Sequence, residues 1–167
     1  MRHLTQESCL GALLMFFLIS VLTLSTARGA MEIELSRGQT VYVPIYSHIY
    51  IGDRDQPYLL AATLSIRNTD PNHPITLVSA DYYDSDGRLL RRYLEQPRDL
   101  PKMASTRFII KESDKTGGSG AKFIVKWTSR TAVNLPIIEG IMIGTKTQQG
   151  ISFLSRGRAI DTKSGLK

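Results

Sequence analysis

The stretch YLLAATLSIRN, residues 58–68, decides the fold class of this chain. Leu60, Ala62, Leu64 and Ile66 occupy alternate positions, and small or polar residues fill the positions between them. Successive side chains of an extended strand point to opposite faces, so this period of two places the four apolar side chains on one face. The stretch therefore predicts a β-strand with one buried face.

Runs of the same kind recur along the chain between clusters of turn residues. In AKFIVKW, residues 121–127, Phe123, Val125 and Trp127 share one face, which predicts a core position for the tryptophan. This pattern predicts an all-β chain, a single Greek-key or immunoglobulin-like β-sandwich of about 7–8 strands. The predicted strands are residues 39–51, 58–68, 75–83, 88–94, 105–111, 121–127, 134–144 and 151–160.

Two local features refine this prediction. Pro44 lies within the first predicted strand and cannot donate to a sheet ladder, so we expect that strand at a sheet edge or broken by a bulge. The DSDG sequence at 84–87 ends in Asp86-Gly87, a pair that favours a tight hairpin. The same aspartates resemble half of a calcium loop, but Tyr82 and Tyr93 stand where that loop needs oxygen ligands, which favours the hairpin.

The first residues have the pattern of a secretory signal. An uncharged apolar run, Leu10 to Leu24, follows a weakly basic start, and small residues precede possible cleavage points after Ala27 or Gly29. The run has 15 residues, fewer than the roughly 20 of a transmembrane helix, although an uncleaved anchor remains the alternative. The expected organisation is a signal peptide at 1–27, a short leader at 28–38, the β-sandwich at 39–160 and a disordered tail at 161–167.

Cysteine usage agrees with export. Cys9 is the only cysteine, and it leaves with the signal, so the mature chain has no thiol. That composition suits an oxidising compartment without requiring one. We expect a periplasmic or otherwise extracytoplasmic location.

The formal charge of +6 favours acidic partners. The charges do not form a long run, and no nucleic-acid-binding motif is present, so we expect no nucleic acid partner. The expected partner is an acidic component of the cell envelope or another protein. Contact with a membrane is expected only through the signal segment, if it stays uncleaved.

The glycine-rich stretch GGSGAK, residues 117–122, raises the possibility of a phosphate loop. A P-loop needs glycine then lysine then serine or threonine, but Ala121 precedes Lys122 and Phe123 follows it. A strand rather than a helix is predicted next, so no helix N-terminus faces an anion. The stretch is therefore interpreted as a turn between two strands, which still allows contact with a ligand.

No pattern indicates catalysis, a metal or a cofactor. His48 and His73 are the only histidines after the signal, neither has a second histidine one helical turn away, and no nucleophile elbow occurs. A copper site joining His48 to Met103 or Met142 is conceivable, but an edge-strand histidine is the simpler interpretation. Glu139 lies on an apolar strand and is expected to pair with Arg107 or Arg156, or to face solvent.

Residues 39–160 resemble a family known only as domain of unknown function 3124. The matching pieces are MASTRFIIKESDKTGGSGAKFIVKW, LPIIEGIMIGT and GISFLSRGRAI, with VYVPIYSHIY and LSIRNTD upstream. The resemblance implies a bacterial, exported protein and brings no activity or cofactor. The positions that carry it are Asp114, Gly117, Gly118, Gly120, Trp127, Glu139, Gly150, Ser152, Phe153 and Gly157.

The leading hypothesis is an exported, non-enzymatic binding module. The alternatives are a periplasmic hydrolase or transferase with a site around His48, Asp81 and Glu139, and a subunit of an envelope complex that adds a strand at the Pro44 edge. The candidate contact residues for a ligand or partner are His48, Arg88, Arg91, Arg92, Asp114, Gly117, Gly118, Gly120, Lys122, Lys126, Glu139, Ser152 and Arg156. No catalytic residue and no metal ligand is predicted.

Overall fold

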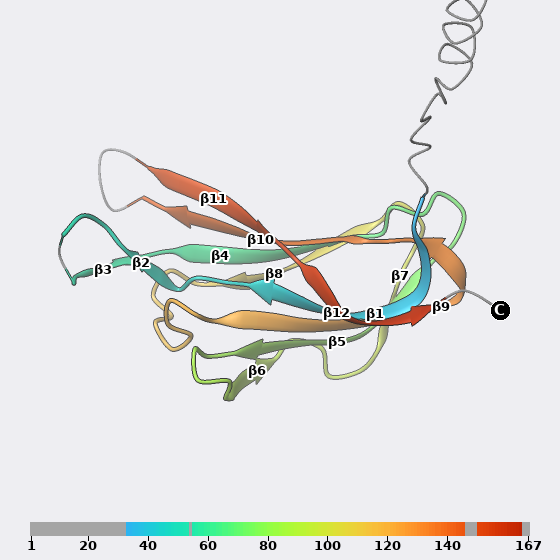
Figure 1. The fold of residues 1–167 in the computed structure, drawn as a ribbon, viewed down its shortest axis with the longest axis horizontal. Coiled ribbons are helices and arrows are strands. Elements are labelled where there is room, and N and C mark those ends of the chain that lie inside the picture. Colours follow the sequence, from blue (N-terminus) through green and yellow to red (C-terminus); the bar gives the residue numbers. More distant parts are fainter. Residues whose placement is uncertain (1–32, 54, 146–149, 165–167) are drawn as a thin grey trace, which may run out of the picture. The chain divides into compact units, whose positions relative to one another are not determined.

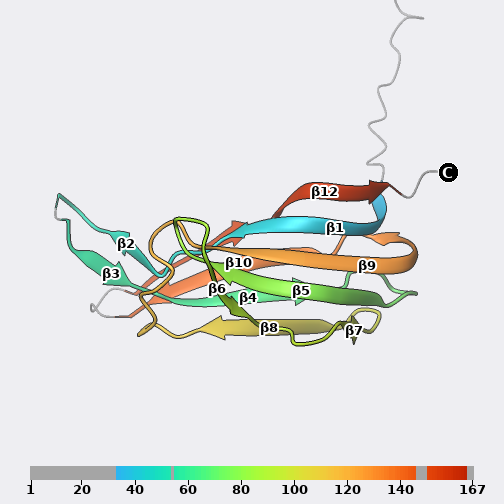
Figure 2. The same cartoon turned by 90° about the horizontal axis from the view of Figure 1, so that it is seen from below.

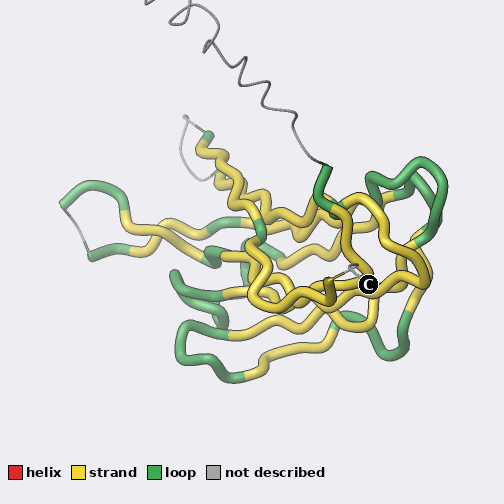
Figure 3. The backbone as a smooth tube through the Cα atoms, turned by 45° about the vertical axis from the view of Figure 1, so that its right-hand side comes forward, coloured by secondary structure: helices red, strands yellow, loops and turns green. Residues whose placement is uncertain are grey.

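The structure is a computed structural model that describes residues 33–53, 55–145 and 150–164. The predicted signal peptide and its cleavage points lie outside the described residues. Within them the chain forms strands joined by loops and turns, without a helix (Figure 3). The described residues contain no helix that is long and apolar enough to cross a bilayer.

Two antiparallel sheets lie face to face and form a sandwich (Figures 1 and 2). The first sheet has six strands in the order β12-β1-β9-β5-β6, with β7 also paired to β5. Its strands are β1 (Leu35–Pro44), β5 (Ile75–Tyr83), β6 (Leu89–Arg92), β7 (Arg98–Leu100), β9 (Lys122–Asn134) and β12 (Arg158–Ser164). This is the all-β sandwich that the period of two predicts.

The second sheet has four strands in the order β11-β10-β4-β8. Its strands are β4 (Ala61–Arg67), β8 (Ser105–Ile110), β10 (Ile137–Gly144) and β11 (Ile151–Arg156). A separate hairpin of β2 (His48–Tyr50) and β3 (Pro57–Leu59) projects from one end (Figure 1). Most neighbouring strands are distant in sequence, because the chain changes sheet at most of its connections.

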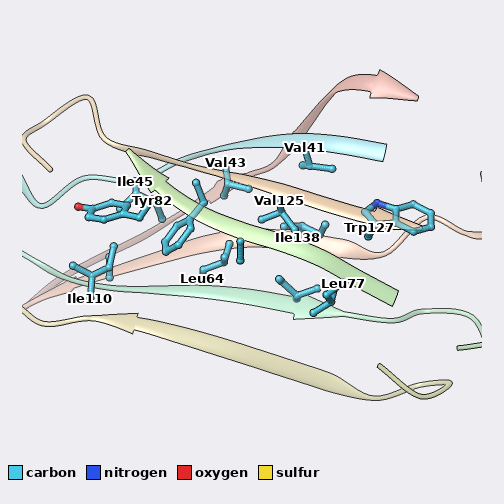
Figure 4. Packing of buried hydrophobic residues seen from close by; sticks show 14 of the residues in the cluster. Val41, Val43, Ile45, Leu64, Leu77, Tyr82, Ile110, Val125, Trp127 and Ile138 are labelled. Carbon is cyan, nitrogen blue, oxygen red and sulfur yellow. The ribbon is translucent and has the colours of Figure 1, made fainter. Parts of the chain in front are cut away.

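The core lies between the two sheets. Leu60, Ala62, Leu64 and Ile66 are all buried, which confirms the side-chain alternation predicted for residues 58–68. Phe123, Val125 and Trp127 are buried from the opposite sheet, so the tryptophan is a core residue as expected. Figure 4 shows side chains of both sheets filling this space, with Val41, Val125 and Trp127 from one sheet facing Leu64 and Ile138 from the other.

One continuous strand joins the two sheets at their edge. β11 pairs with β10 in the four-stranded sheet, and after the single residue Gly157 the chain continues as β12 beside β1 in the six-stranded sheet. A Cβ at Gly157 would lie 2.7 Å from the carbonyl oxygen of Ile138 and 2.7 Å from a methyl of Val41. Only glycine fits this crossing without displacing backbone.

The position of Pro44 corrects one expectation. β1 is not an edge strand, because it lies between β9 and β12. Pro44 is tolerated because it is the last residue of β1, where the pairing with β12 has already ended at Tyr42. The carbonyl oxygen of Pro44 instead accepts a hydrogen bond from the Ser155 hydroxyl. The Pro44 edge is therefore not available for strand addition.

The predicted domain limits are too narrow at both ends. β1 begins at Leu35, four residues before the predicted start at residue 39, inside the expected leader. β12 continues to Ser164, where it pairs with Ser36, so residues 161–164 of the expected disordered tail form part of a strand. β7, at 98–100, is a further strand inside a proline-rich crossing that the sequence pattern did not resolve.

Candidate interaction surface

The glycine loop joins β8 to β9, so it is a connection between two strands as the sequence predicted. It packs on the hairpin turn that follows β5. The Ser85 amide and hydroxyl donate to the carbonyl oxygen of Gly117, at 3.0 Å and 3.1 Å. The Gly120 amide donates to the Ser85 hydroxyl at 3.0 Å. The Gly120 amide, which is the kind of group that a phosphate-binding loop presents to its ligand, is therefore already bonded within the protein.

The glycines of this loop are required by close packing. A Cβ at Gly117 would lie 1.9 Å from the Tyr82 hydroxyl, and one at Gly118, where φ is +77°, would lie 2.5 Å from the Ser85 hydroxyl. Tyr82 is 1 % exposed and its hydroxyl shares a hydrogen bond of 2.9 Å with Ser47. Burial raises the pKa of Tyr82, although the bond to Ser47 partly opposes this. The loop therefore encloses a buried tyrosine.

Three other predicted residues lie at this end of the sandwich. The Lys122 ammonium donates to the carbonyl oxygen of Asp84, and the Arg88 amide donates to the Asp84 carboxylate at 2.8 Å within the predicted hairpin. The Asp114 carboxylate accepts from the amide and hydroxyl of Thr116 at 3.0 Å and 2.6 Å. The bonds of Arg88 and Asp114 close local turns, and the bond from Lys122 ties the start of β9 to the hairpin turn after β5, so these groups have a structural role.

The remaining predicted cations do not converge. Lys126 is exposed on the outer face of the six-stranded sheet. Arg92 lies opposite Asp81 at the β5–β6 pairing, whereas Arg91 lies over the ring of Tyr93, with its guanidinium carbon 4.5 Å from the ring centroid. Arg92, Lys122 and Lys126 therefore share the outward side of the six-stranded sheet in separate rows of its register, whereas Arg91 lies over an aromatic ring.

The three residues of the suggested hydrolase site lie apart. His48 is on the projecting hairpin, where its ring packs edge-on against Tyr50, with centroids 5.3 Å apart. Asp81 lies on β5 between the buried residues Ala80 and Tyr82, so it faces outward from the six-stranded sheet. Glu139 faces outward from the other sheet. This combination is therefore not a catalytic site.

A polar cluster that sequence analysis did not select surrounds Asp70. The buried Asp70 carboxylate accepts hydrogen bonds from the amides of Asn72 and His73, both at 2.8 Å, and of Asn134 at 3.1 Å. It also lies 3.2 Å from Nδ1 of His73. Burial alone would raise the pKa of Asp70, but these donors outweigh it and hold the pKa below its ordinary value. The cluster fixes the turn at 70–73 to the β9–β10 connection.

The outward side of the four-stranded sheet carries both apolar and charged side chains. We call this surface the outer face below. Because Leu64, Ile138 and Ile110 point into the core, the residues that alternate with them point outward. The pairing register aligns these outward residues in rows across the sheet. One row contains Ile109, Thr63, Ile141 and Leu154, and the adjacent row contains Arg107, Ser65, Glu139 and Arg156.

The apolar side chains of this face are well exposed. Ile109 and Leu154 are each 56 % exposed, and Ile143 and Ile137 are each 48 % exposed. With four strands about 4.8 Å apart and a rise of about 3.4 Å per residue, the face measures about 400 Å². Part of this area is polar, since the row of Arg107, Ser65, Glu139 and Arg156 crosses it. The face therefore offers a small apolar strip bordered by charged groups, an arrangement that favours an interaction site.

Three predicted residues lie on this face, and its arrangement shows whether Glu139 pairs with Arg107 or Arg156. Glu139, Ser152 and Arg156 all belong to it. Glu139 is half-buried and faces Arg156 on one neighbouring strand and Ser65 on the other. Within the described parts of the chain, no ion pair within 4.0 Å joins Glu139 to Arg107 or Arg156. Its carboxylate therefore lies on a surface with more positive than negative charge.

The isoleucines and the leucine of the outer face carried a signal in the sequence that was not used. Ile109-Ile110, Ile137-Ile138, Ile141-Met142-Ile143 and Phe153-Leu154 are apolar at consecutive positions. A strand with one wet face alternates, so consecutive apolar residues on an exposed sheet indicate that both faces are apolar.

No metal centre accompanies this surface within the described part of the chain. No three histidine, cysteine or acidic side chains come together as metal ligands in residues 33–53, 55–145 and 150–164. The hollow lined by His73, Thr76, Asp99 and Arg130, of about 400 Å³, is open to solvent.

Comparison with known proteins agrees with the resemblance seen in the motifs. No curated protein and no solved structure shows significant similarity to the chain. The sequence model of one family, described as "Protein of unknown function (DUF3124)", matches residues 38–160. That range includes β1 from its fourth residue, the glycine loop, the outer face and the Gly157 crossing. The chain belongs to this family, Protein of unknown function (DUF3124).

Proposed function

We propose that this protein is an exported binding module that acts without catalysis and uses the outer face to hold another component of the cell envelope. The observation that carries the proposal is the row of Ile109, Thr63, Ile141 and Leu154 across the four-stranded sheet, in which Ile109 and Leu154 are exposed and Ile141 is half-buried. Keeping large aliphatic side chains in water gives a folded monomer no benefit, whereas burying them under a partner stabilises a complex.

The rest of the sandwich supports this assignment by contrast. The outward residues of β9 on the other sheet include Lys122, Lys126 and Thr128, which suit contact with water. The glycine loop and the Asp70 cluster are occupied by internal hydrogen bonds. The six-stranded sheet also exposes large apolar side chains, among them Val78, Leu89 and Ile160, but in the four-stranded sheet the pairing register aligns Ile109, Ile141 and Leu154 in one row.

Export is part of the proposal and depends on residues 1–27. The apolar run from Leu10 to Leu24 and the small residues before Ala27 or Gly29 have the order of a secretory signal. Mass spectrometry of the mature protein tests this directly. We expect the first residue to be Arg28 or Ala30, and an intact Met1 in all of the protein would contradict cleavage.

The binding role is tested by placing a photocrosslinking amino acid at Leu154 in cells. A control variant carries it at Thr40, on β1 of the other sheet. We expect one discrete adduct from the Leu154 position, lost when Ile109 is changed to lysine, and no such adduct from Thr40. The same adduct from both positions, or none from Leu154, would contradict the assignment of the outer face.

The estimated size of the face guides the choice of method. At about 400 Å² it is about half of what one partner buries in a standard interface of about 800 Å² per side. A complex limited to this face is expected to be weak or transient. Covalent trapping is therefore a better test than co-purification.

A further inference from the structure

The charged groups that border the apolar row indicate what kind of partner fits it. Arg107 and Arg156 lie at the two ends of the row next to it, on the edge strands β8 and β11. Arg67, also on this face, lies beside Ser65, with its Nε donating to that hydroxyl at 3.3 Å. Glu139 is the acidic residue among them, so these three arginines and one glutamate give +3 − 1 = +2.

We infer that the outer face binds an amphipathic protein segment in which aliphatic side chains stand next to carboxylates. This inference rests on the proposed function and adds the chemistry of the partner. Aliphatic groups of the segment would cover Ile109, Ile141 and Leu154, and its carboxylates would meet Arg107 and Arg156. Arginine is suited to this role because its planar guanidinium donates two parallel hydrogen bonds to a carboxylate.

A second copy of this chain is a poor occupant of the same face. A two-fold contact would bring +2 against +2, with six arginines facing two glutamates. Like charges placed against each other in an interface cost free energy, and the apolar row is too small to offset many such contacts. Charge complementarity therefore favours an acidic partner over self-association.

A lipid surface is also a poor match. Proteins that lie at a membrane interface commonly present tryptophan, tyrosine or phenylalanine, whose rings fit the headgroup level. The outward positions of the four-stranded sheet are instead isoleucine, leucine, alanine, threonine and serine between the charged residues. Aromatic anchors of this kind are therefore missing from the rows described for this face.

Two synthetic amphipathic peptides of equal length test the inference. Both carry leucine at the same positions, and the flanking positions are glutamate in one and lysine in the other. Binding to the mature protein is followed by fluorescence anisotropy at low and at high salt. We expect the glutamate peptide to bind, the lysine peptide not to bind, and the affinity to fall as salt screens the arginines.

Charge reversal supplies the decisive comparison. In the double variant Arg107→Glu and Arg156→Glu we expect about tenfold weaker binding of the glutamate peptide, together with measurable binding of the lysine peptide. Lys126→Glu on the other sheet is the matched control and is expected to leave both affinities unchanged. Circular dichroism of each variant confirms that the sandwich is folded.

Each other outcome overturns the inference. Equal binding of the two peptides, or binding of neither, contradicts the proposed partner chemistry. Tighter binding to phosphatidylglycerol vesicles that is lost in the double variant assigns the face to lipid. Self-association that is lost on Ile109→Lys assigns it to a second copy. If the crosslink at Leu154 persists while the peptides fail, the binding role stands and only the partner class is wrong.

Discussion

Replacing Gly117 with alanine is expected to destabilise the fold by about 2–6 kcal/mol. The added Cβ would lie 1.9 Å from the hydroxyl and 2.7 Å from Cζ of Tyr82. An ordinary contact needs about 3.5 Å, so the ring must withdraw by about 1.5 Å. Tyr82 is 1 % exposed and packs against Phe123 with ring centroids 5.2 Å apart, so it has no free space into which to move.

Two costs make up this magnitude. Forcing an extra methyl into a packed interior typically costs about 1–3 kcal/mol. Moving the tyrosine also breaks its 2.9 Å bond to Ser47, which leaves two buried hydroxyls without a partner. Such a loss costs about 1–3 kcal/mol. The sum is a large part of the total stability of a typical domain, about 5–15 kcal/mol.

Urea denaturation followed by tryptophan fluorescence measures the effect. Trp127 is the only tryptophan and is 1 % exposed, so its emission reports the loss of the core. Gly150→Ala is the matched control, because a Cβ there would meet nothing closer than 3.9 Å. We expect the control to change the free energy of unfolding by less than about 0.5 kcal/mol.

A double-mutant cycle isolates the clash. Tyr82→Phe removes the atom at 1.9 Å and leaves Cζ at 2.7 Å, so Gly117→Ala should cost less in that background. We expect a coupling free energy of about 1–2 kcal/mol. If Gly117→Ala leaves the stability of the wild-type protein unchanged, or costs as much beside Phe as beside Tyr, the glycine is not present for packing and the loop is free to have another role.

Three further substitutions test the Asp70 cluster, the Gly157 crossing and the exposure of Leu154. The pKa of Asp70 is lowered in the folded state, so its carboxylate adds to the free energy of unfolding. This added stability is complete above the unfolded pKa of about 3.9 and is lost as pH falls toward the folded pKa. Asp70→Asn should therefore destabilise the protein by about 1–3 kcal/mol at pH 7 and flatten its acid unfolding profile, with exposed Asp99→Asn as control. Gly157→Ala, with its Cβ 2.7 Å from a backbone carbonyl, should cost about 1–3 kcal/mol in the urea assay, and an unchanged midpoint would contradict the close crossing. Leu154→Lys should change the stability by less than about 0.5 kcal/mol, because this side chain is 56 % exposed, and a larger loss would place it in the core.

The sequence predicted the core better than the borders of the elements. The alternation at 58–68 identified Leu64 and Ile66 as buried because one face of β4 meets the opposite sheet. Pro44 was misplaced because its missing amide seemed to require an edge, whereas the end of a pairing ladder serves equally well. Proline lacks one backbone N–H, and this matters only where the neighbouring strand would accept a hydrogen bond from it. The pairing of the whole strand decides where that is.

The candidate surface was only partly visible in the sequence. Glu139 and Arg156 were selected separately, but their alignment across β10 and β11 depends on pairing register, which residue types alone do not give. Asp70 was missed because one of its hydrogen-bond donors, the Asn134 amide, is 64 residues away along the chain. Long-range contacts of this kind appear only when the fold is known.

The position of β1 has a consequence for how the chain acquires its structure. β1 is among the first strands in sequence, yet its two neighbours, β9 and β12, come from the second half of the chain and its end. Neither side of β1 is paired until those late segments arrive, and the strand that bridges the two sheets at Gly157 is the last of the described strands. The pairing of β1 is therefore complete only after β12 has been made, a long-range dependence of the kind that slows the folding of β-proteins.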